Sequence, residues 1–412
     1  MKEHQNVTLV PQYLRKFSCI GSECEDTCCV GWRVDIDKRT YLKYKQVKKP
    51  SVKVLLNENI KRTRKNATEK TYAHIKLDNN HSCPMLTKDR LCQIQLELGE
   101  EYLSNVCSSY PRVTNIVNGI IEKSATLSCP EAARLALLNP EKMEFDEIIE
   151  EADKKMALQG ILKIGNEAHK LSTYFWNLRI FSISLIQQRR YSLADRLILL
   201  GIFLKDVDRL VEKQQHTAIP TLVNKYHTLI EQGSLLDSLN QIPIEPTLQI
   251  KLLKKIIDIR LLLGLHHKRY SQCHADFLSG IGFSDDAPLE DIASRYQSAY
   301  HNYYKPFMDQ HEYILENYLV NYIFKNLFPL GSNDKCMEDY VKLILHYGII
   351  KMHLIGIAGH YRDSFNESHV ITCIQSIGRV VEHNNGYLNY CLELLKTLDV
   401  NSLAGMAIFI KN

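Results

Sequence analysis

The stretch FSCIGSECEDTCCVGW, residues 17 to 32, places four cysteines close together near the start of the chain. Four more cysteines follow before residue 130, whereas the last four are scattered singly. Scattered cysteines are usually small buried hydrophobic residues, so the dense group needs another cause. We therefore expect a cysteine-rich module over residues 1–140 and a second domain over residues 141–412. The dense group comprises Cys19, Cys24, Cys28, Cys29, Cys83, Cys92, Cys107 and Cys129, and the scattered cysteines are Cys273, Cys336, Cys373 and Cys391.

Three kinds of chemistry can explain the dense group. Disulfides suit small secreted scaffolds, but this chain is large and its N-terminus has no signal-peptide pattern. Structural zinc usually takes paired cysteines two to four residues apart in two hooks, and no CxxC hook is present. An iron–sulfur cluster accepts looser spacing with distant ligands, and one tight group plus single cysteines fits it better. Cys24-x3-Cys28 is half of a radical S-adenosylmethionine motif, but Gly31 stands where the third cysteine is expected.

Carboxylates accompany the first cysteines. Glu25, Asp26 and Asp37 are possible oxygen donors to a metal, although helix caps and surface positions are the commoner role for such residues. Adjacent Cys28 and Cys29 rarely ligate one iron together, so one of them has another role. The sequence does not decide which four cysteines bind the metal.

Short elements are expected in the N-terminal region. Asn118-Gly119 lies between two apolar runs, and these two residues tolerate the positive φ angles of a type I′ hairpin turn. Pro130 suits the first position of a helix. The predicted elements are helices over Thr40–Val47 and Val52–Lys65, a strand over Tyr72–Leu77, hairpin strands over Val113–Val117 and Ile120–Leu127, and a helix from Pro130.

From about Met143 onward the apolar pattern is helical almost without interruption. Ser192 and Asp195 have the spacing of a helix N-terminus, and Leu193, Leu197 and later leucines follow on one face. Prolines separate helices of ordinary length. The predicted fold is mainly α, with a small α+β cysteine-rich metal-binding module packed on a large α-helical domain.

The composition limits the classes of partner that the protein is expected to bind. The 412 residues carry a net charge of +4, far from the bias of a nucleic-acid-binding protein, and no run of 18 apolar residues suggests a membrane span. We expect a cytoplasmic protein that binds neither nucleic acid nor membrane. Basic residues gather at Lys45–Lys53 and at Arg62, Arg64 and Lys65; they form either solvated helix faces or a docking surface for an acidic protein.

Several longer strings resemble one family, the flagellin lysine N-methylases (FliB). They are CIGSECEDTCCVGWRVDID, CPML, CQIQLELGEEYLSNVCSSYPR, LSCPEAARLAL, YYKPF near Tyr303, ENYLVNYIF from Glu316 and IQSIGRVVEHN from Ile374. The cysteine segment also resembles a wider group of zinc- or iron-chelating CxxCxxCC domains. The resemblance implies methyl transfer from S-adenosylmethionine to lysines of flagellin, in the bacterial flagellum, and a cysteine-bound cluster of the 4Fe–4S type. No Rossmann glycine motif accompanies it, because Gly356-Ile-Ala-Gly359 lies in a helical pattern.

Lysine methylation requires a neutral amine aligned with the methyl donor in a mostly apolar slot. On a helix, Tyr318 and Tyr322 share a face, as do Asn317 and Asn321. We expect Tyr318 and Tyr322 to steer the substrate lysine as catalytic residues. Glu316, Asn317 and Asn321 could hold the donor, although a polar network between helices explains the same pattern.

Tyr110 and Arg112 follow Cys107 and are a second candidate for donor binding, since an arginine beside a cluster could grip a carboxylate. A structural turn is the commoner explanation for such residues. The absence of a recognised donor motif also supports a different hypothesis, a non-enzymatic metal-binding or redox-sensing module with a helical partner-binding domain.

Overall fold

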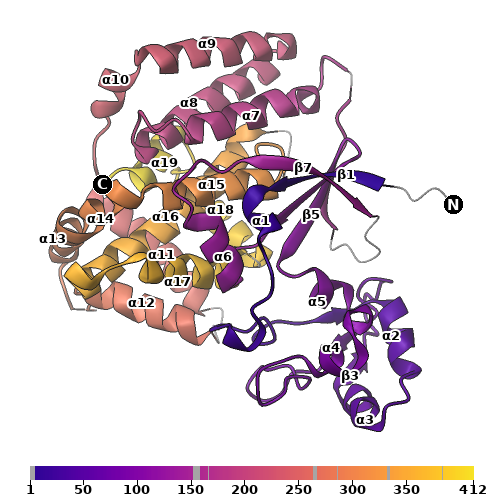
Figure 1. The fold of residues 1–412 in the computed structure, drawn as a ribbon. Coiled ribbons are helices and arrows are strands. Elements are labelled where there is room, and N and C mark those ends of the chain that lie inside the picture. The colour runs from indigo at the N-terminus through magenta and orange to yellow at the C-terminus, as the bar shows by residue number, and fades with distance from the viewer. Residues whose placement is uncertain are drawn as a thin grey trace.

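A mixed five-stranded sheet connects the N-terminal region to the helices (Figure 1). The computed structural model describes residues 5–151, 158–165, 167–262, 267–284, 286–331, 335–382 and 384–412. Strand β1 pairs in parallel with β6 and antiparallel with β7, and β5 pairs with β6 and β8. The order is β7-β1-β6-β5-β8, with β1 Gln5–Pro11, β5 Arg112–Val117, β6 Ile120–Ala125, β7 Phe145–Glu151 and β8 Leu158–Leu162.

The predicted hairpin is confirmed. Strands β5 and β6 pair from Arg112 with Ala125 to Val117 with Ile120. The turn residues Asn118 and Gly119 both have positive φ, 49° and 86°, as a type I′ turn requires.

Strands β7 and β8 correct the prediction of continuous helix from Met143. The segment FDEIIEE of β7 also fits a helical pattern, but it lies antiparallel to β1 along its whole length. Partner strands decide such short ambiguous runs, because strand preference depends on cross-strand contacts more than on the residues themselves. The sheet takes strands from both sides of residue 140, and the division at that position stays a prediction.

A small separate core lies within the cysteine-rich region. It packs Val34, Ile36, Val52 and Leu56 with cysteines of the dense group. The expected helix over Val52–Lys65 is shorter than predicted, because its last residues form an edge strand. The elements of the cysteine-rich region are α2 Lys38–Lys45, α3 Pro50–Asn59, α4 Gln93–Leu98, α5 Asn105–Ser109 and a three-stranded sheet in the order β2 Asp35–Ile36, β4 Ala73–Ile75, β3 Ile60–Arg62.

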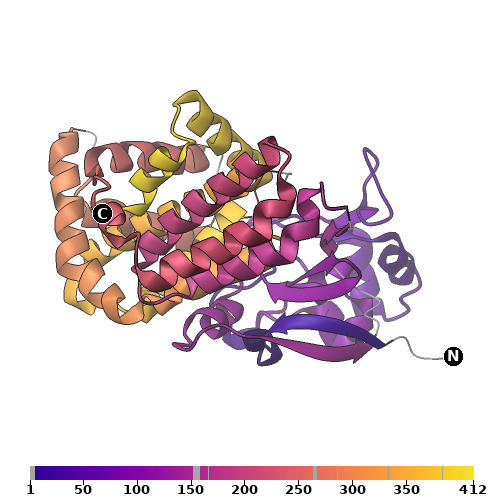
Figure 2. The ribbon, with the colours of Figure 1, turned by 90° about the horizontal axis from the view of Figure 1, so that it is seen from above.

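The larger core extends from the five-stranded sheet through the helical region, so the predicted mainly α fold is confirmed. Figure 2 shows the N-terminal sheet and module gathered at one end of the helices. Ser192 accepts a hydrogen bond from the Asp195 amide at the start of α8, as predicted. The main helices are α1 Gln12–Arg15, α6 Pro130–Leu137, α7 Phe175–Ile186, α8 Leu193–Glu212, α9 Ile219–Gln232, α10 Leu236–Asn240, α11 Pro246–Leu262, α12 Lys268–Gly280, α13 Leu289–Ala299, α14 Lys305–His311, α15 Tyr313–Lys325, α16 Cys336–Tyr361, α17 Glu367–Ile377, α18 Asn385–Thr397 and α19 Leu403–Ile410.

Short helical turns join these elements. Two of them, η5 Tyr300–Tyr304 and η7 Gly378–Glu382, are π-helical, a conformation that is rare and frequent at functional sites. The others are the 3₁₀ turns η1 Gly21–Glu23, η2 Glu100–Tyr102, η3 Leu171–Tyr174, η4 His216–Ala218 and η6 Arg362–Ser364.

Helix α16 runs through the larger core. By length and composition it could span a membrane, but 94% of its apolar window is buried inside the fold, as in the core helix of a globular domain. Helix α16 crosses α12, and a glycine on each helix lets the two backbones come into contact. A Cβ atom on Gly280 would lie 1.7 Å from the carbonyl oxygen of Gly356, so both helices need glycine at this crossing. The Gly356-Ile-Ala-Gly359 segment thus serves helix packing.

Candidate functional site

A cavity of about 430 Å³ lies between the five-stranded sheet and the helices, within the size range of small-molecule sites. Strands β5 and β8 supply one wall, and helices α15, α16 and α18 supply the others. The lining is mostly polar. It comprises Val113, Thr126, Gln159, Tyr322, Lys325, Asn326, Phe328, Gly331, Asp339, Lys342, His346, Glu382, Leu388 and Asn389.

Glu382, at the end of the π-helical turn η7, is the central acidic group of this cavity. Its side chain is 7% exposed and forms an ion pair with the Lys325 ammonium. The Tyr318 hydroxyl donates a hydrogen bond to Glu382 Oε1 at 3.3 Å. Two of the strings that carry the family resemblance, ENYLVNYIF and IQSIGRVVEHN, therefore meet at this carboxylate.

Tyr322 lies one helical turn beyond Tyr318 and lines the cavity. Burial, with the Asp339 and Glu382 carboxylates nearby, raises the pKa of Tyr322 well above its ordinary value. The phenol is therefore protonated at neutral pH and available as a hydrogen-bond donor. Its ring lies 5.1 Å from the ring of His346, measured between centroids.

His346 is the neutral base of the cavity. Burial lowers the pKa of His346, so the ring is uncharged near pH 7. Its Nδ1 lies 2.7 Å from the carbonyl oxygen of Lys342. Because a carbonyl only accepts, Nδ1 carries the hydrogen, which leaves Nε2 as an acceptor.

The remaining predicted residues of α15 point elsewhere. Asn317 donates to the carbonyl oxygen of Asn139 at 2.8 Å, and Asn321 Oδ1 accepts from the Tyr13 hydroxyl at 2.6 Å. Glu316 is buried between two guanidinium groups, Arg189 Nη2 at 2.9 Å and Arg196 Nη1 at 2.8 Å. These contacts form a polar network that ties α15 to neighbouring elements. The assignment of Glu316, Asn317 and Asn321 to donor binding stays a prediction.

Tyr110 lies between the module and the sheet, and Arg112 begins strand β5 of the sheet. The Tyr110 hydroxyl lies 3.1 Å from Ser128 Oγ, and its ring centroid lies 6.0 Å from that of Trp32. The Arg112 guanidinium lies 5.0 Å from the centre of the Phe17 ring. Burial, with the Cys129 thiol nearby, raises the pKa of Tyr110. Both residues are thus neighbours of the cysteine region, and neither lines the cavity.

The thiols of the dense group converge from four separate segments. Cys83, Cys92 and Cys107 lie close enough to one another and to Cys28 for their charges to interact. Cys28 and Cys29 have their sulfur atoms 4.0 Å apart. The remaining members differ: Cys24 lies near Cys28 and Cys129, and Cys19 is exposed.

The thiols of this group are protonated as free cysteines. Burial raises the pKa of Cys83 and of Cys107 to about 12. Within the described ranges, no three His, Cys, Asp or Glu side chains converge as around a single ion.

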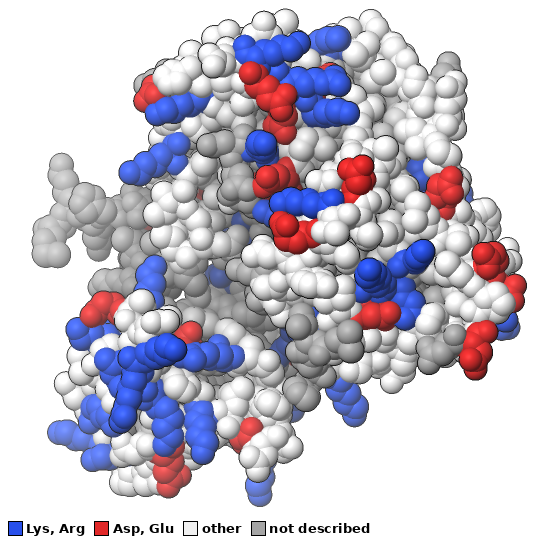
Figure 3. All heavy atoms as spheres, turned by 180° about the vertical axis from the view of Figure 1, so that it is seen from behind, with Lys and Arg blue, Asp and Glu red and all other residues white. Residues whose placement is uncertain are grey.

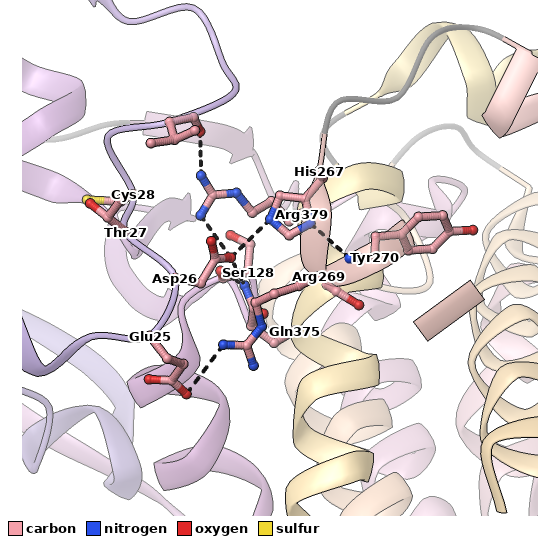
Figure 4. Close-up of polar contacts among 12 residues, drawn as sticks. Glu25, Asp26, Thr27, Cys28, Ser128, His267, Arg269, Tyr270, Gln375 and Arg379 are labelled. Carbon is pink, nitrogen blue, oxygen red and sulfur yellow. Dashed lines mark hydrogen bonds and ion pairs between the residues drawn. The ribbon is translucent and has the colours of Figure 1, made fainter. Parts of the chain in front are cut away.

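Asp26 fixes the cysteine loop to the helical region (Figure 4). Its Oδ2 accepts from Gln375 Nε2 at 2.8 Å and lies 3.2 Å from Arg379 Nη1 and 3.1 Å from His267 Nε2. Arg379 also donates to the carbonyl oxygen of Val30. Glu25 beside it forms an ion pair with Arg134 at 2.6 Å.

The role of Asp26 corrects its interpretation as a cap or surface residue, because its side chain is 14% exposed and contacts α17 and the turn η7. Glu25 is a surface residue, as expected, and Asp37 caps α2. Sequence reasoning also missed Lys325, Asp339, His346 and Glu382. Of these, Glu382 alone had a signal, its place in a string that resembles the family.

Comparisons with known proteins agree with the resemblance. The family model described as FliB lysine N-methylase C-terminal domain matches residues 179–409. A lysine-N-methylase of Salmonella typhimurium is 27% identical over 384 residues, which cover 91% of this chain and 92% of that protein, and one of Salmonella choleraesuis has the same identity and coverage. The flagellar biosynthetic protein FliU of Salmonella muenchen is 37% identical over 138 residues, 33% of this chain and 80% of that protein. No solved structure matches the chain.

Proposed function

Because the chain belongs to the FliB lysine N-methylase family, we propose that it transfers methyl groups from S-adenosylmethionine to lysine side chains of flagellin. Family membership makes it a methyltransferase and decides against the non-enzymatic metal-binding hypothesis. The observation that supports the location of the reaction is the cavity at Glu382, where Tyr318 and Tyr322 meet a buried carboxylate.

The residues of the cavity suit a lysine substrate. A lysine side chain arrives as an ammonium ion, and the carboxylates of Glu382 and Asp339 attract it. S-adenosylmethionine supplies a methyl group on a positively charged sulfur, which the same carboxylates favour. The Tyr322 hydroxyl in the cavity lining orients the amine for in-line attack, and the Tyr318 hydroxyl positions the Glu382 carboxylate by its hydrogen bond.

Two further groups favour the neutral amine that attack requires. The Lys325 ammonium adds a like charge, which lowers the pKa of a second amine bound nearby. The free Nε2 of His346 is an acceptor in the cavity for the proton that the substrate loses. The amine is thereby deprotonated before the new N–C bond forms.

We further propose that Cys83, Cys92 and Cys107, with Cys28 or Cys29, hold an iron–sulfur cluster of the four-iron type. Such a cluster would fix the loop that carries Asp26 and so place the module against the helices. Zinc is the alternative metal. This proposal rests on the convergence of the buried thiols and on the spacing of the cysteines.

Purification without oxygen, followed by iron and sulfide analysis and a methylation assay on flagellin with mass spectrometry, tests the function. Wild type should produce methyl-lysine, and Glu382→Gln should lower kcat/KM at least about 100-fold. Glu290→Gln, an exposed carboxylate on α13, is the matched control. Metal-replete wild type that methylates no flagellin lysine would contradict the proposal. Thermal unfolding of Glu382→Gln separates lost chemistry from lost folding.

A further inference from the structure

Positive charge is concentrated in one part of the cysteine-rich module. Residues 38–76 contain thirteen Lys and Arg but only two Asp and Glu, a net charge of +11 in a chain of +4, so the rest of the molecule carries −7. Figure 3 shows these basic side chains crowded on the lobe that the module forms. We name this the basic surface. Its exposed members are Arg39, Lys45, Lys48, Lys49, Lys53, Lys61, Arg62, Arg64, Lys65, Lys70 and Lys76.

The chain neutralises little of this charge. Among the described residues, the basic surface has ion pairs from Lys38 to Glu69 at 2.8 Å and from Lys49 to Glu97 at 3.0 Å. Lys45 instead contacts the Tyr41 ring and Asn57, neither of which carries a neutralising charge. Repulsion among these positive charges lowers the stability of the folded state, and their electrostatic field favours association with a negatively charged partner.

Nucleic acid is not the partner that this surface fits best. Ten of the thirteen cations are lysines, which act as point charges, whereas phosphate and base recognition favours the planar fork of arginine. The Arg62 guanidinium lies 3.2 Å from the centre of the Tyr72 ring and donates to the carbonyl oxygen of Thr63. The ring of Tyr41 is covered by Lys45 at 5.4 Å. These rings are engaged within the module and are not a free platform for bases.

A lipid surface is also a poor fit. A helix that lies in a membrane interface presents a broad apolar face. On α3, Val52 and Leu56 are buried in the module core, and among its large apolar residues Val54, at 55% exposure, is the exposed one. Leu42, at 50%, lies apart on α2. The exposed apolar residues are therefore isolated and form no broad apolar face.

We propose that the basic surface docks an acidic segment of the protein substrate and so forms a second contact outside the cavity. This inference rests on the proposed function. The two regions have opposite charge preferences: the cavity with Glu382 and Asp339 receives a lysine, and the basic surface receives carboxylates. A substrate protein with a lysine and an acidic segment at the right separation satisfies both, which selects one protein over free lysine or unrelated peptides.

The test compares two triple variants that change the net charge equally. Lys48→Glu, Lys53→Glu and Lys65→Glu reverse exposed lysines of the basic surface, and the control reverses Lys205, Lys225 and Lys251, which are exposed on α8, α9 and α11. Kinetics are measured with intact flagellin and with a short lysine peptide that has no acidic residues. Binding of flagellin without the methyl donor is measured at low and high salt.

The basic-surface variant should raise KM for intact flagellin about tenfold with kcat unchanged, because each exposed charge contributes a modest attraction. The peptide kinetics and the control variant should match wild type, and flagellin binding should weaken with salt. Equal effects on peptide and flagellin, or equal effects of the two variants, would overturn the proposal, as would tighter binding of duplex DNA or of anionic vesicles than of flagellin. Salt-dependent flagellin binding without methyl transfer would retain the docking surface and reject the proposed function.

Discussion

The carboxylate of Asp26 accepts a hydrogen bond of 2.8 Å from Gln375, although 349 positions separate the two residues in the chain. The same amide group of Gln375 donates to the carbonyl oxygen of Ser128 at 2.8 Å, next to Cys129. One side chain of α17 thus holds two cysteine-bearing segments together. The position of the cysteine region depends on this contact and on Arg379.

Asp26→Asn should destabilise the fold. It removes the charge between Arg379 and His267 and leaves a buried cation without its partner, which costs about 3 kcal/mol of unfolding free energy. Urea unfolding measures the loss, and hydrogen exchange should show the loop of residues 19–31 opening first. Asp89→Asn, an exposed acid of the same module, should change stability by less than about 0.5 kcal/mol. Equal stability of the two variants would show that the Asp26 contacts contribute nothing.

Tyr322→Phe should lower kcat about 10- to 100-fold with little change in KM for flagellin, because the ring and its packing on His346 remain while the hydroxyl donor is lost. Steady-state methylation kinetics measure the effect. Tyr390→Phe on α18, where the ring is 54% exposed, is the control and should behave as wild type. A Tyr322→Phe enzyme with full kcat would remove this hydroxyl from the mechanism.

Cys83→Ser and Cys107→Ser should each abolish or strongly reduce bound iron and sulfide, because these thiols lie in the converging group. Cys391→Ser is the matched control, a buried single cysteine on α18 far from that group in sequence. Bound iron, sulfide and zinc are measured in each variant after anaerobic purification. Unchanged iron in both module variants, or zinc in place of iron, would reject the assignment of the cluster.

Because the Lys351 amine is buried, we expect the stability of the protein to depend on pH. Burial lowers the pKa of Lys351 to about 7, with Glu312 and Lys411 as the charged neighbours, while the unfolded chain keeps a value of about 10.4. Between these values the unfolded state binds the extra proton, so stability rises with pH from about 7 to about 10, by at most about 5 kcal/mol. Below pH 7 both states are protonated, so stability no longer changes with pH and the folded state carries the full cost of burying the charged amine.

Urea unfolding of wild type and Lys351→Met across this range isolates the effect from the titration of cysteines and tyrosines. The variant loses the hydrogen bond of 2.7 Å to the Ile410 carbonyl and is less stable at high pH. The difference between the two proteins should shrink as pH falls toward 7. Parallel curves would show that Lys351 stays charged throughout.

The sequence predicted the elements whose signals are local. The Asn118-Gly119 turn, the Pro130 helix start and the Ser192 cap depend on a few adjacent residues, and the structure confirms each. The strands β7 and β8 depend on partners elsewhere in the chain, and a period of apolar residues does not reveal them. The end of α3 was missed for the same reason, since Ile60–Arg62 pairs with β4.

The residues of the candidate site also fall into those with a local sequence signal and those that only tertiary packing brings together. Tyr322 could be named as a candidate because its helical spacing with Tyr318 is visible in the sequence. Asp339, His346 and Glu382 come from two other elements, and only packing brings them to one cavity. The ion pairs of Glu316 could not be predicted, because its partners Arg189 and Arg196 lie over a hundred positions away.

The close packing of α12 against α16 at their glycines also affects the position of the cysteine region. Because Gly280 and Gly356 leave no space for a methyl group, the angle of α12 is set by backbone contact, which side-chain repacking cannot relax. The other end of α12 begins at His267, whose ring caps the helix with one nitrogen and lies 3.1 Å from Asp26 with the other. Alanine at either glycine would tilt the helix and pull this histidine from its carboxylate. An added methyl group at one end of α12 would therefore displace the cysteine loop of residues 19–31 at the other end.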